Sequence, residues 1–449
     1  MITMTLPQAA KVLGCKDVGG ATSFRGITSD SRMVNDGMMF AALSGDHVDG
    51  HDFAAAALNY GASCVLVNRK LDIPVSQLVV PDVLAALGKL AAWWRAETDP
   101  SVVAITGSNG KTTTREMVTR VLELDANVLS TAGNYNNELG LPLTLFGLNH
   151  EHRYAVLELG ASKGGDIAYL AEISAPDIAL ITNVGPAHLQ GFGNEEGVAR
   201  AKGELYQALP LDGTAIINID ELWCDVWQEM SPAKNFITFG RKTNSDIYPE
   251  STTQGIEIKT PSGSFPLNLH LPGEHNLHNA LAATAVALAL NIPLDQIRQG
   301  LEDTMPVPGR LNLIRTENGW TVIDDTYNAN PASLYAALQV LTHQQGEPWL
   351  VLGDMKELGH NSHRMHAEMG EAARALGVKR IFAVGDSSIF TVDAFGRGGS
   401  HFTDHKSLLK ALCSEISAGV TCLVKGSRSM GMEQVVQAIT GPMAMREAG

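Results

Sequence analysis

The amino-acid sequence predicts an α/β protein of three domains, with parallel sheets in the two larger ones. Short apolar runs alternate with amphipathic helical segments along most of the chain, which is typical of parallel strands connected by helices. The chain has 449 residues. At roughly 150 residues per domain this length corresponds to about three domains, because a single hydrophobic core rarely grows past ~250–300 residues.

The first domain is predicted to be a small α/β module over residues 1–82. Between Gly26 and Val80, short apolar runs are separated by Gly/Asp turns and by one Ala-rich helical stretch over residues 52–59. A second helical pattern, residues 82–96, ends in Glu-Thr-Asp-Pro, which is a helix-stop signal. We therefore place the first domain boundary at this helix.

The central domain, residues 83–309, is predicted to contain a parallel sheet covered by helices. Strand-like runs and helical patterns alternate in this order: strand 101–106, helix 111–124, strands 154–160 and 177–184, helix 199–209 and strand 214–219. A hairpin is expected around residues 256–271, followed by an Ala-rich helix over residues 280–290 and a short helix that ends near Leu301. Two prolines and a glycine within Met305 to Arg310 mark the second boundary.

The last domain, residues 310–449, is predicted to contain a second open α/β sheet, similar to a Rossmann fold. Expected strands and helices alternate again: strand 321–325, helix 332–341, strand 348–354, helix 366–376, strands 380–386 and 420–426, and a terminal helix. Asp and Gly residues stand at the carboxyl ends of these strands. Ligands of open α/β sheets bind at those ends, so we expect a binding site there.

The charge balance excludes one class of function. The chain has 33 Lys and Arg residues and 48 Asp and Glu residues, which gives a formal net charge of −15. A protein that binds duplex nucleic acid needs a basic face to neutralise phosphates, so we expect no nucleic-acid partner. A local basic pocket for a small anion is compatible with this charge.

Other composition features predict a cytoplasmic monomer that does not insert into membranes. The first residues lack a basic stretch followed by an apolar core, so we expect no signal peptide. The longest apolar candidate, residues 280–290, is only about half of the ~20 residues that a bilayer requires. The five cysteines are never in C-x-x-C spacing, which favours reduced thiols. No long heptad pattern is visible.

The clearest local motif is a glycine-rich loop between a predicted strand and a predicted helix. It contains Gly107, Ser108, Asn109, Gly110, Lys111, Thr112 and Thr113. Glycines let backbone N–H groups approach phosphate oxygens, a lysine supplies a mobile positive charge, and a threonine hydroxyl can bind magnesium. The usual motif, G-x-x-x-x-G-K-[ST], has another glycine where this chain has Ile105. The strand–loop–helix setting nevertheless predicts a phosphate-binding loop.

With this loop, the sequence resembles the Mur ligase family, which uses ATP to join an amino acid or dipeptide to a UDP-muramoyl carrier. Residues 106–112 closely match the ATP loop of the family, and further matching motifs follow in family order along nearly the whole chain. The resemblance implies that ATP is a substrate and Mg²⁺ a cofactor. It assigns catalytic roles to Lys111, Glu158, His188 and Lys202, and magnesium binding to Thr112, Glu158 and Lys202.

Lys202 matches a lysine that many Mur ligases carry as a carbamate, a CO₂ adduct. This modification turns a cation into an anion, and only the anion suits Mg²⁺ as a ligand. We therefore predict that Lys202 is carbamylated. His188, within residues 183–189, matches a loop histidine that the family places near the metal.

Two further residues are assigned to the nucleotide by the resemblance. Asn276 is expected near the adenine, although an asparagine before an Ala-rich helix can equally be an N-cap. Arg310, which follows Pro308 and Gly309, is expected to contact the nucleotide when the last domain closes. Its guanidinium presents a fork of donors that suits phosphate or ribose oxygens. The Pro-Gly pair is then a candidate hinge.

Residues near the N-terminus resemble the UDP-binding domain of the family. The matching segments are 28–32, 40–45 and 49–53, and they imply that Ser31 and Arg32 bind the substrate. In the central domain, Asn134, Asn136 and Asn137 resemble a substrate-facing cluster of amides, while turn formation is the alternative explanation for these asparagines.

Motifs in the last domain select a substrate within the family. Residues 324–331 (DDTYNANP) and 353–359 (GDMKELG) resemble the members that add D-alanyl-D-alanine to UDP-N-acetylmuramoyl-tripeptide, and the Asp-Asn-Pro motif of a sibling ligase is absent. The implied substrate-binding residues are Asp325, Tyr327, Asn328, Asn330, Lys425 and Arg428. The alternative interpretation of Asp325 is a solvated residue at a strand end. The alternative interpretation of Lys425 and Arg428 is an ordinary charged surface.

The implied reaction activates the tripeptide carboxylate as an acyl phosphate, which the amine of D-alanyl-D-alanine then attacks to give the UDP-MurNAc-pentapeptide of peptidoglycan synthesis. Asp325 and His188 are the candidates for the base that deprotonates the amine. Alternatives are another Mur-type ligase, a folylpolyglutamate synthase, or a nucleotide switch that hydrolyses ATP without ligation. His360, His363 and His366 are spaced by three, but no suitable Cys or carboxylate accompanies them, so we expect no zinc there.

Overall fold

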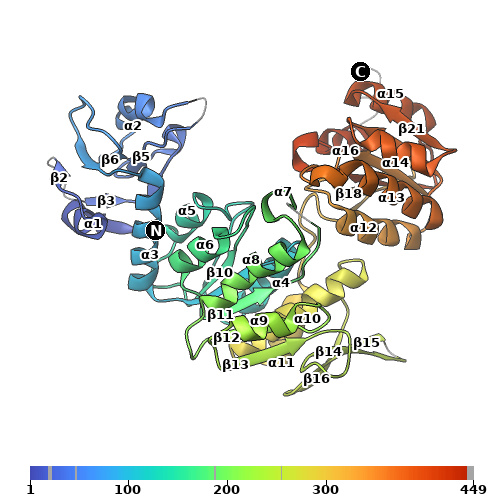
Figure 1. The fold of residues 1–449 in the computed structure, drawn as a ribbon, viewed down its shortest axis with the longest axis horizontal. Helices are drawn as coiled ribbons and strands as arrows, with labels where there is room; N and C mark the ends of the chain where they lie inside the picture. The colour runs from blue at the N-terminus through green and yellow to red at the C-terminus, as the bar shows by residue number, and fades with distance from the viewer. Residues whose placement is uncertain (19–22, 46–47, 187–188, 254, 442–449) are drawn as a thin grey trace.

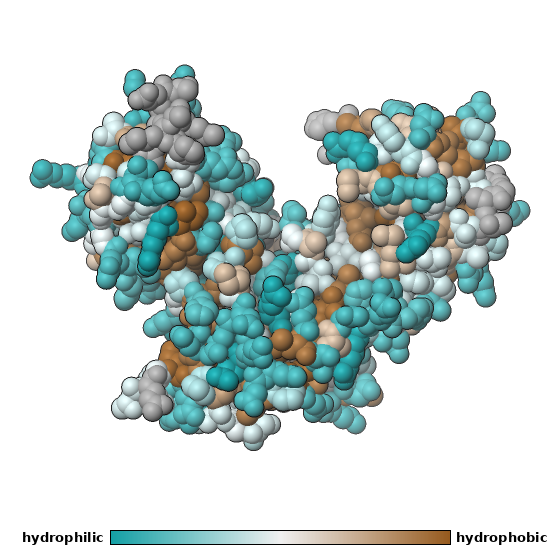
Figure 2. Space-filling view, turned by 180° about the vertical axis from the view of Figure 1, so that it is seen from behind, coloured by the Kyte–Doolittle hydropathy of each residue, from teal (hydrophilic) through white to brown (hydrophobic). Residues whose placement is uncertain are grey.

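The computed structural model describes residues 1–18, 23–45, 48–186, 189–253 and 255–441. The chain forms three lobes that follow one another in sequence order (Figure 1). The N-terminal and C-terminal lobes stand on either side of the central lobe, and a wide notch separates them in the space-filling view (Figure 2). This arrangement confirms the predicted three-domain α/β architecture.

The N-terminal lobe contains a five-stranded sheet in the order β2-β7-β6-β5-β4. Its strands are β2 (Asp17–Val18), β4 (Ile27–Thr28), β5 (Met39–Ala41), β6 (Cys64–Val67) and β7 (Ser76–Val79), all parallel except β2 at one edge. The helix expected at residues 52–59 is observed as α2 (Ala54–Asn59), after a 3₁₀ turn over Gly50–Phe53. The pairing of β1 (Thr3–Thr5) with β3 (Ser23–Arg25) and the helix α1 (Leu6–Leu13) were not predicted.

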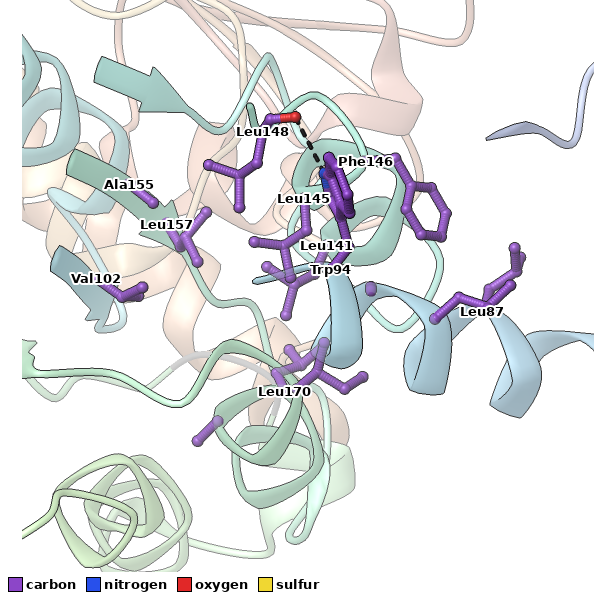
Figure 3. Close-up of a cluster of buried hydrophobic side chains, with 14 of the residues drawn as sticks. Leu87, Trp94, Val102, Leu141, Leu145, Phe146, Leu148, Ala155, Leu157 and Leu170 are labelled. Carbon is purple, nitrogen blue, oxygen red and sulfur yellow. Dashed lines mark hydrogen bonds between the residues drawn. The ribbon is translucent and has the colours of Figure 1, made fainter. Parts of the chain in front are cut away.

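Helix α3 (Val83–Thr98) joins the first two lobes into one hydrophobic core. Asp82 caps its first turn by accepting a hydrogen bond from the backbone N–H of Ala85 at 3.0 Å. The helix packs against α1 on one side and against α5 (Gly140–Leu145) and α6 (Asp166–Ser174) on the other. Trp94 lies among leucines of the central lobe, and its indole Nε1 donates to the Leu148 carbonyl at 3.0 Å (Figure 3). Helix α3, at which we placed the first domain boundary, is therefore part of the core of both lobes.

The central sheet has six parallel strands in the order β13-β12-β11-β8-β10-β9. They are β8 (Ser101–Thr106), β9 (Val128–Ser130), β10 (Tyr154–Glu158), β11 (Ile178–Ile181), β12 (Thr214–Asn218) and β13 (Asn235–Phe239). The four inner strands were predicted. The two edge strands were not, because they are short or partly exposed and carry no long apolar run.

Helices cover both faces of this sheet. On one face lie α4 (Lys111–Glu123), α10 (Glu274–Ala289) and α11 (Leu294–Glu302), and on the other lie α3, α5, α6, α8 (Glu195–Gln207) and α9 (Cys224–Met230). The Ala-rich α10 packs against both α4 and the strands β11 to β13, since its small side chains allow close approach. The expected hairpin is part of a three-stranded antiparallel sheet of β14 (Tyr248–Thr252), β15 (Gly255–Thr260) and β16 (Gly263–Leu267).

The C-terminal lobe contains the second predicted sheet, in the order β17-β18-β22-β19-β20-β21. Its strands are β17 (Asn312–Arg315), β18 (Thr321–Asp325), β19 (Glu347–Gly353), β20 (Arg380–Val384), β21 (Gly399–Phe402) and β22 (Val420–Lys425), and only β17 is antiparallel. The helices are α12 (Pro331–His343), α13 (Ser362–Ala375), α14 (Ser388–Phe395), α15 (His405–Glu415) and α16 (Glu433–Thr440). Because β22 inserts between β18 and β19, the carboxyl ends of these three strands are neighbours.

The surface shows no continuous apolar band on the face seen in Figure 2, where hydrophobic residues occur in separate small groups. Within the described ranges, no helix is long and apolar enough to cross a membrane.

Candidate active site

A cleft of about 1690 Å³ lies where the central and C-terminal lobes meet. One wall is the carboxyl edge of the central sheet, with the glycine-rich loop after β8 and the first turn of α10. The other wall belongs to the C-terminal lobe, with the ends of β18 and β22 and one side of α12. Both sheets thus present their ligand-binding edges to the same space.

The glycine-rich loop is held in a conformation that requires glycine. The φ angles of Gly107 and Gly110 are 150° and 81°. A Cβ atom on Gly107 would lie 1.9 Å from the Thr182 hydroxyl, and one on Gly110 would lie 2.4 Å from the Asn279 side chain. Only glycine therefore fits at these two positions of the loop.

The Asn183 side chain clamps the loop from the end of β11. Its Oδ1 accepts a hydrogen bond from the Asn109 N–H at 2.9 Å, and its Nδ2 donates to the Asn109 carbonyl at 3.0 Å. The Thr182 hydroxyl donates to the same carbonyl at 2.6 Å. Sequence reasoning gave Asn183 no role, although a polar residue directly after a buried parallel strand was the available signal.

Lys111 lies under the loop at the start of α4. Its Nζ donates to the Gly107 carbonyl at 2.6 Å. Burial lowers the pKa of Lys111, the nearby Glu158 carboxylate opposes this shift, and the positive charge of Arg310 adds to it. Lys111 is therefore a desolvated cation placed beside the loop amides, where it is available to an anion in the cleft.

Glu158 ends β10 with its carboxylate buried beside the loop. The side chain is only 2% exposed. Its Oε2 accepts from the Thr112 hydroxyl at 2.7 Å, and its Oε1 accepts from Asn136 Nδ2 at 2.9 Å. A carboxylate and a hydroxyl in contact are hard oxygen donors of the kind that Mg²⁺ prefers, so this pair fits a magnesium ion. Asn136, which the resemblance placed in the substrate-facing cluster of amides, positions the carboxylate.

Lys202 lies on α8, in the wall of the same cleft, and is 4% exposed. Burial lowers its pKa well below the usual lysine value, and the charge of Lys111 lowers it further. No described residue accepts a hydrogen bond from its Nζ. As an ammonium group Lys202 cannot bind a metal, but a buried uncharged amine is the form that reacts with CO₂.

Among the described residues of the C-terminal lobe, two side chains are hydrogen-bonded to the glycine-rich loop. Arg310 Nη2 donates to the Thr112 hydroxyl at 2.8 Å, and the guanidinium lies 4.0 Å from the centre of the Tyr327 ring. Asn330 caps α12 and donates from Nδ2 to Asn109 Oδ1 at 2.8 Å. Residues some 200 positions apart in the sequence therefore converge on one loop.

Asp325 and Lys425 form a buried ion pair between the ends of β18 and β22. Lys425 Nζ donates to the Asp325 carboxylate and, at 2.9 Å, to the Asn328 carbonyl. Burial raises the pKa of Asp325, and Lys425 opposes this shift. Lys425 therefore has an internal partner at the cleft wall. Arg428 does not line the cleft; its side chain is 66% exposed and lies 3.8 Å from Glu433.

Asn276 is inside the first turn of α10, whose N-cap is Gly273, so the alternative explanation of Asn276 as an N-cap is wrong. Its Nδ2 donates to the Pro272 carbonyl at 2.7 Å, and its Oδ1 accepts from Asn279 at 3.2 Å. It lines the cleft, as does Asn137, whose Oδ1 accepts from the Gly140 N–H at 2.9 Å.

Other predicted residues lie elsewhere. Asn134 is exposed and does not line the cleft. Ser31 and Arg32 belong to a 3₁₀ turn of the N-terminal lobe outside this cleft, and Arg32, 85% exposed, is paired with Asp30 at 2.7 Å. His188 lies outside the described residues.

Two of the three spaced histidines have other contacts. His363 stacks on Phe390 with ring centroids 4.1 Å apart. His366 is buried; its Nε2 accepts from the Met355 N–H at 3.0 Å, and its Nδ1 lies 2.8 Å from the Ser362 carbonyl, so it fixes the loop after β19. In the part of the chain that the structure describes, no group of three or more His, Cys, Asp or Glu side chains is placed to hold a metal.

Comparisons with known proteins match this architecture lobe by lobe. Three family models match in order: "Mur ligase family, catalytic domain" over residues 23–94, "Mur ligase middle domain" over 105–287, and "Mur ligase, glutamate ligase domain" over 309–428. The chain belongs to the Mur ligase family.

Individual Mur ligases match over almost the full length. The UDP-N-acetylmuramoyl-tripeptide–D-alanyl-D-alanine ligase of Escherichia coli (strain K12) is 43% identical, covering 98% of this chain and 99% of that protein. A crystal structure of MurF from Acinetobacter baumannii has a TM-score of 0.92 at 35% identity, covering 100% and 99%. The MurF ligase of Thermotoga maritima in complex with ADP has a TM-score of 0.81 at 29% identity, covering 92% and 96%.

The ion pair between Asp325 and Lys425 gives a stability prediction. Lys425→Met leaves a buried carboxylate without its partner and is expected to lower the free energy of unfolding of the C-terminal lobe by about 3–5 kcal/mol. The double variant Asp325→Leu/Lys425→Met replaces both charges and is expected to recover most of this loss. Denaturant unfolding measures both values. A double variant less stable than Lys425→Met would contradict the assigned pairing.

Proposed function

We propose that the chain is an ATP-dependent ligase that joins D-alanyl-D-alanine to UDP-N-acetylmuramoyl-tripeptide, giving UDP-MurNAc-pentapeptide for peptidoglycan synthesis. The observation that carries this proposal is the meeting of two ligand-binding sheet edges in one cleft, one with a phosphate loop and one with the polar ends of β18 and β22. The named relatives at high coverage support the choice of substrates.

The central lobe is proposed to bind ATP. Residues 107–113 line the cleft, and the backbone N–H groups of the first turn of α4, together with Lys111, would bind the phosphates. Arg310 would contact the nucleotide once it leaves Thr112. Asn276 lines the same cleft and would lie near the adenine, with its orientation fixed by Pro272 and Asn279.

In the proposed reaction, the terminal carboxylate of the tripeptide attacks the γ-phosphorus of ATP. A new O–P bond forms, the bond to the β-phosphate oxygen breaks, and ADP leaves. The amine of D-alanyl-D-alanine then attacks the acyl carbon, and inorganic phosphate leaves from the tetrahedral intermediate. Charge on the moving phosphoryl group is stabilised by Lys111 and the loop amides, so positioning and electrostatics supply most of the rate acceleration.

The proton of the attacking amine needs an acceptor. Asp325 lines the cleft, and its raised pKa makes it a stronger base than an ordinary carboxylate, so it is the described residue that we propose for this role. His188 is the other candidate.

Magnesium is proposed to bind through Thr112, Glu158 and carbamylated Lys202. When bound, it would neutralise charge on the phosphate oxygens. The support from this chain is the contact between Thr112 and Glu158, together with the burial of Lys202 in the same cleft. His188 is proposed to lie near the same metal, as in the family.

Each lobe is proposed to have its own substrate. Residues 1–82 would bind the UDP-muramoyl peptide, residues 83–309 ATP, and residues 310–449 the dipeptide. The residues proposed to contact the two peptide substrates are Ser31, Arg32, Asn134, Asn137, Asp325, Tyr327, Asn328, Asn330, Lys425 and Arg428. We further propose that the protein acts as a cytoplasmic monomer.

Phosphate release tests the reaction. With ATP, Mg²⁺ and UDP-MurNAc-tripeptide, D-alanyl-D-alanine is expected to stimulate phosphate release, because only an amine acceptor discharges the acyl phosphate. Parallel reactions pair meso-diaminopimelate, L-lysine and glutamate with their cognate UDP-muramoyl peptides. Stimulation by a single amino acid instead of the dipeptide would identify another Mur-type ligase. Phosphate release that no amine stimulates would identify a nucleotide switch.

Carbamylation of Lys202 has a separate test. Depleting CO₂ from the buffer is expected to reduce ligase activity, and adding bicarbonate is expected to restore it, because the neutral amine of Lys202 adds CO₂ with loss of a proton. Lys202→Arg cannot form the carbamate and is expected to stay inactive in bicarbonate. Lys234→Arg, an exposed lysine, serves as the matched control. Full activity in CO₂-free buffer would refute the modification.

A further inference from the structure

Arg310 lies where a metal ion would have to approach Thr112. Its Nη2 donates to the Thr112 hydroxyl at 2.8 Å, and that hydroxyl donates in turn to Glu158 at 2.7 Å. The hydroxyl proton is therefore directed at Glu158, and the guanidinium occupies one of the two oxygen lone pairs through which a metal could bind. A positive charge from the C-terminal lobe thus occupies the place proposed for magnesium.

The guanidinium is held by few other contacts. It stacks on Tyr327 at 4.0 Å, and its buried Nε has no hydrogen-bond partner among the described residues. An unpartnered buried donor is costly, so this position is stabilised chiefly by the Thr112 contact and by the nearby carboxylates. A group held in this way can be displaced by a stronger ligand for the same oxygen atoms.

The backbone around Arg310 is also strained. The two flanking residues, Gly309 and Leu311, have φ angles of 74° and 50°. The left-handed region is uncommon for a leucine, and such strain gathers at switch segments. Leu311 is fixed through its N–H, which donates to Asp325 at 3.2 Å. Movement of Arg310 is therefore linked to the first strands of the C-terminal lobe.

We infer that Arg310 is a built-in competitor for the divalent metal, occupying the Thr112 and Glu158 site until the metal replaces it. A guanidinium and a divalent cation repel each other at contact distance and cannot share one hydroxyl. Binding of the metal must therefore expel Arg310 and break one of the contacts that dock the C-terminal lobe on the loop. This inference rests on the proposed function only in naming the metal, and it makes Arg310 a regulator of lobe position as well as a nucleotide contact.

The expected effect is a gain in metal affinity when Arg310 is removed. If Arg310 occupies the site about 90% of the time, its loss raises the apparent affinity roughly tenfold, since apparent affinity scales with the competent fraction. The probe is Mn²⁺, titrated into the nucleotide-free full-length protein and followed by the EPR signal of the free ion. Arg310→Ala is expected to bind Mn²⁺ roughly tenfold more tightly than the unsubstituted protein.

Two matched variants separate competition from other effects. Asn330→Ala removes the second hydrogen bond that a described side chain of the C-terminal lobe donates to the loop, without touching Thr112. Arg241→Ala removes a cleft-lining cation that is paired with Asp220 and Glu274 instead. Both are expected to leave Mn²⁺ affinity close to that of the unsubstituted protein. Equal gains in these variants would mean that loosening or net charge causes the effect and would overturn the inference.

A second substitution guards against misfolding. Arg310→Gln keeps a hydrogen-bond donor but loses the charge, and it is also expected to bind Mn²⁺ more tightly. Unchanged or weaker Mn²⁺ binding by a folded Arg310→Ala or Arg310→Gln would overturn the inference. Because the titration contains neither ATP nor peptide, its result is independent of which acceptor the ligase assay identifies.

Discussion

The hydrogen bond from Thr112 to Glu158 joins the two structural units that make the nucleotide site. Thr112 begins α4 directly after the glycine-rich loop, and Glu158 ends the neighbouring parallel strand. Parallel pairing of β8 with β10 places both residues at the same sheet edge, and burial of the carboxylate makes the contact strong. Asn136 donates a hydrogen bond to the carboxylate, and Arg310 donates one to Thr112 from the C-terminal lobe. The charge of Glu158 raises the pKa of Lys111, and the charge of Arg310 lowers it. The geometry of the cleft depends on this contact.

The net charge of the whole chain differs in sign from the formal charges of several side chains that gather around its cleft. A net charge of −15 is unfavourable for nucleic acid, yet Lys111, Lys202, Arg310 and Lys425 gather around one cavity. Burial lowers the pKa values of Lys111 and Lys202, and Lys425 forms an ion pair with Asp325. Burial thus disfavours the charged forms of Lys111 and Lys202, while Asp325 balances the charge of Lys425 and Arg310 contacts the Thr112 hydroxyl. This explains how an acidic protein can bind polyanionic nucleotides.

Much of the fold could be predicted because its signals are local. The inner strands β8, β10, β11 and β12 carry buried apolar runs, and the phosphate loop is contiguous in sequence. The short edge strand β9 and the partly exposed β13 carry no such run and were missed.

The site was less predictable because its contacts are distant in sequence. Asp325 and Lys425 pair across 100 residues only because β22 inserts beside β18, and no local pattern reports that insertion. Arg310 was assigned to the nucleotide by resemblance, while its contact with Thr112 depends on how two lobes pack. The most direct test is small-angle X-ray scattering with and without a non-hydrolysable ATP analogue, Mg²⁺ and UDP-MurNAc-tripeptide. If the ligands assemble the site by closing the lobes, the radius of gyration decreases on saturation; an unchanged radius would contradict this account.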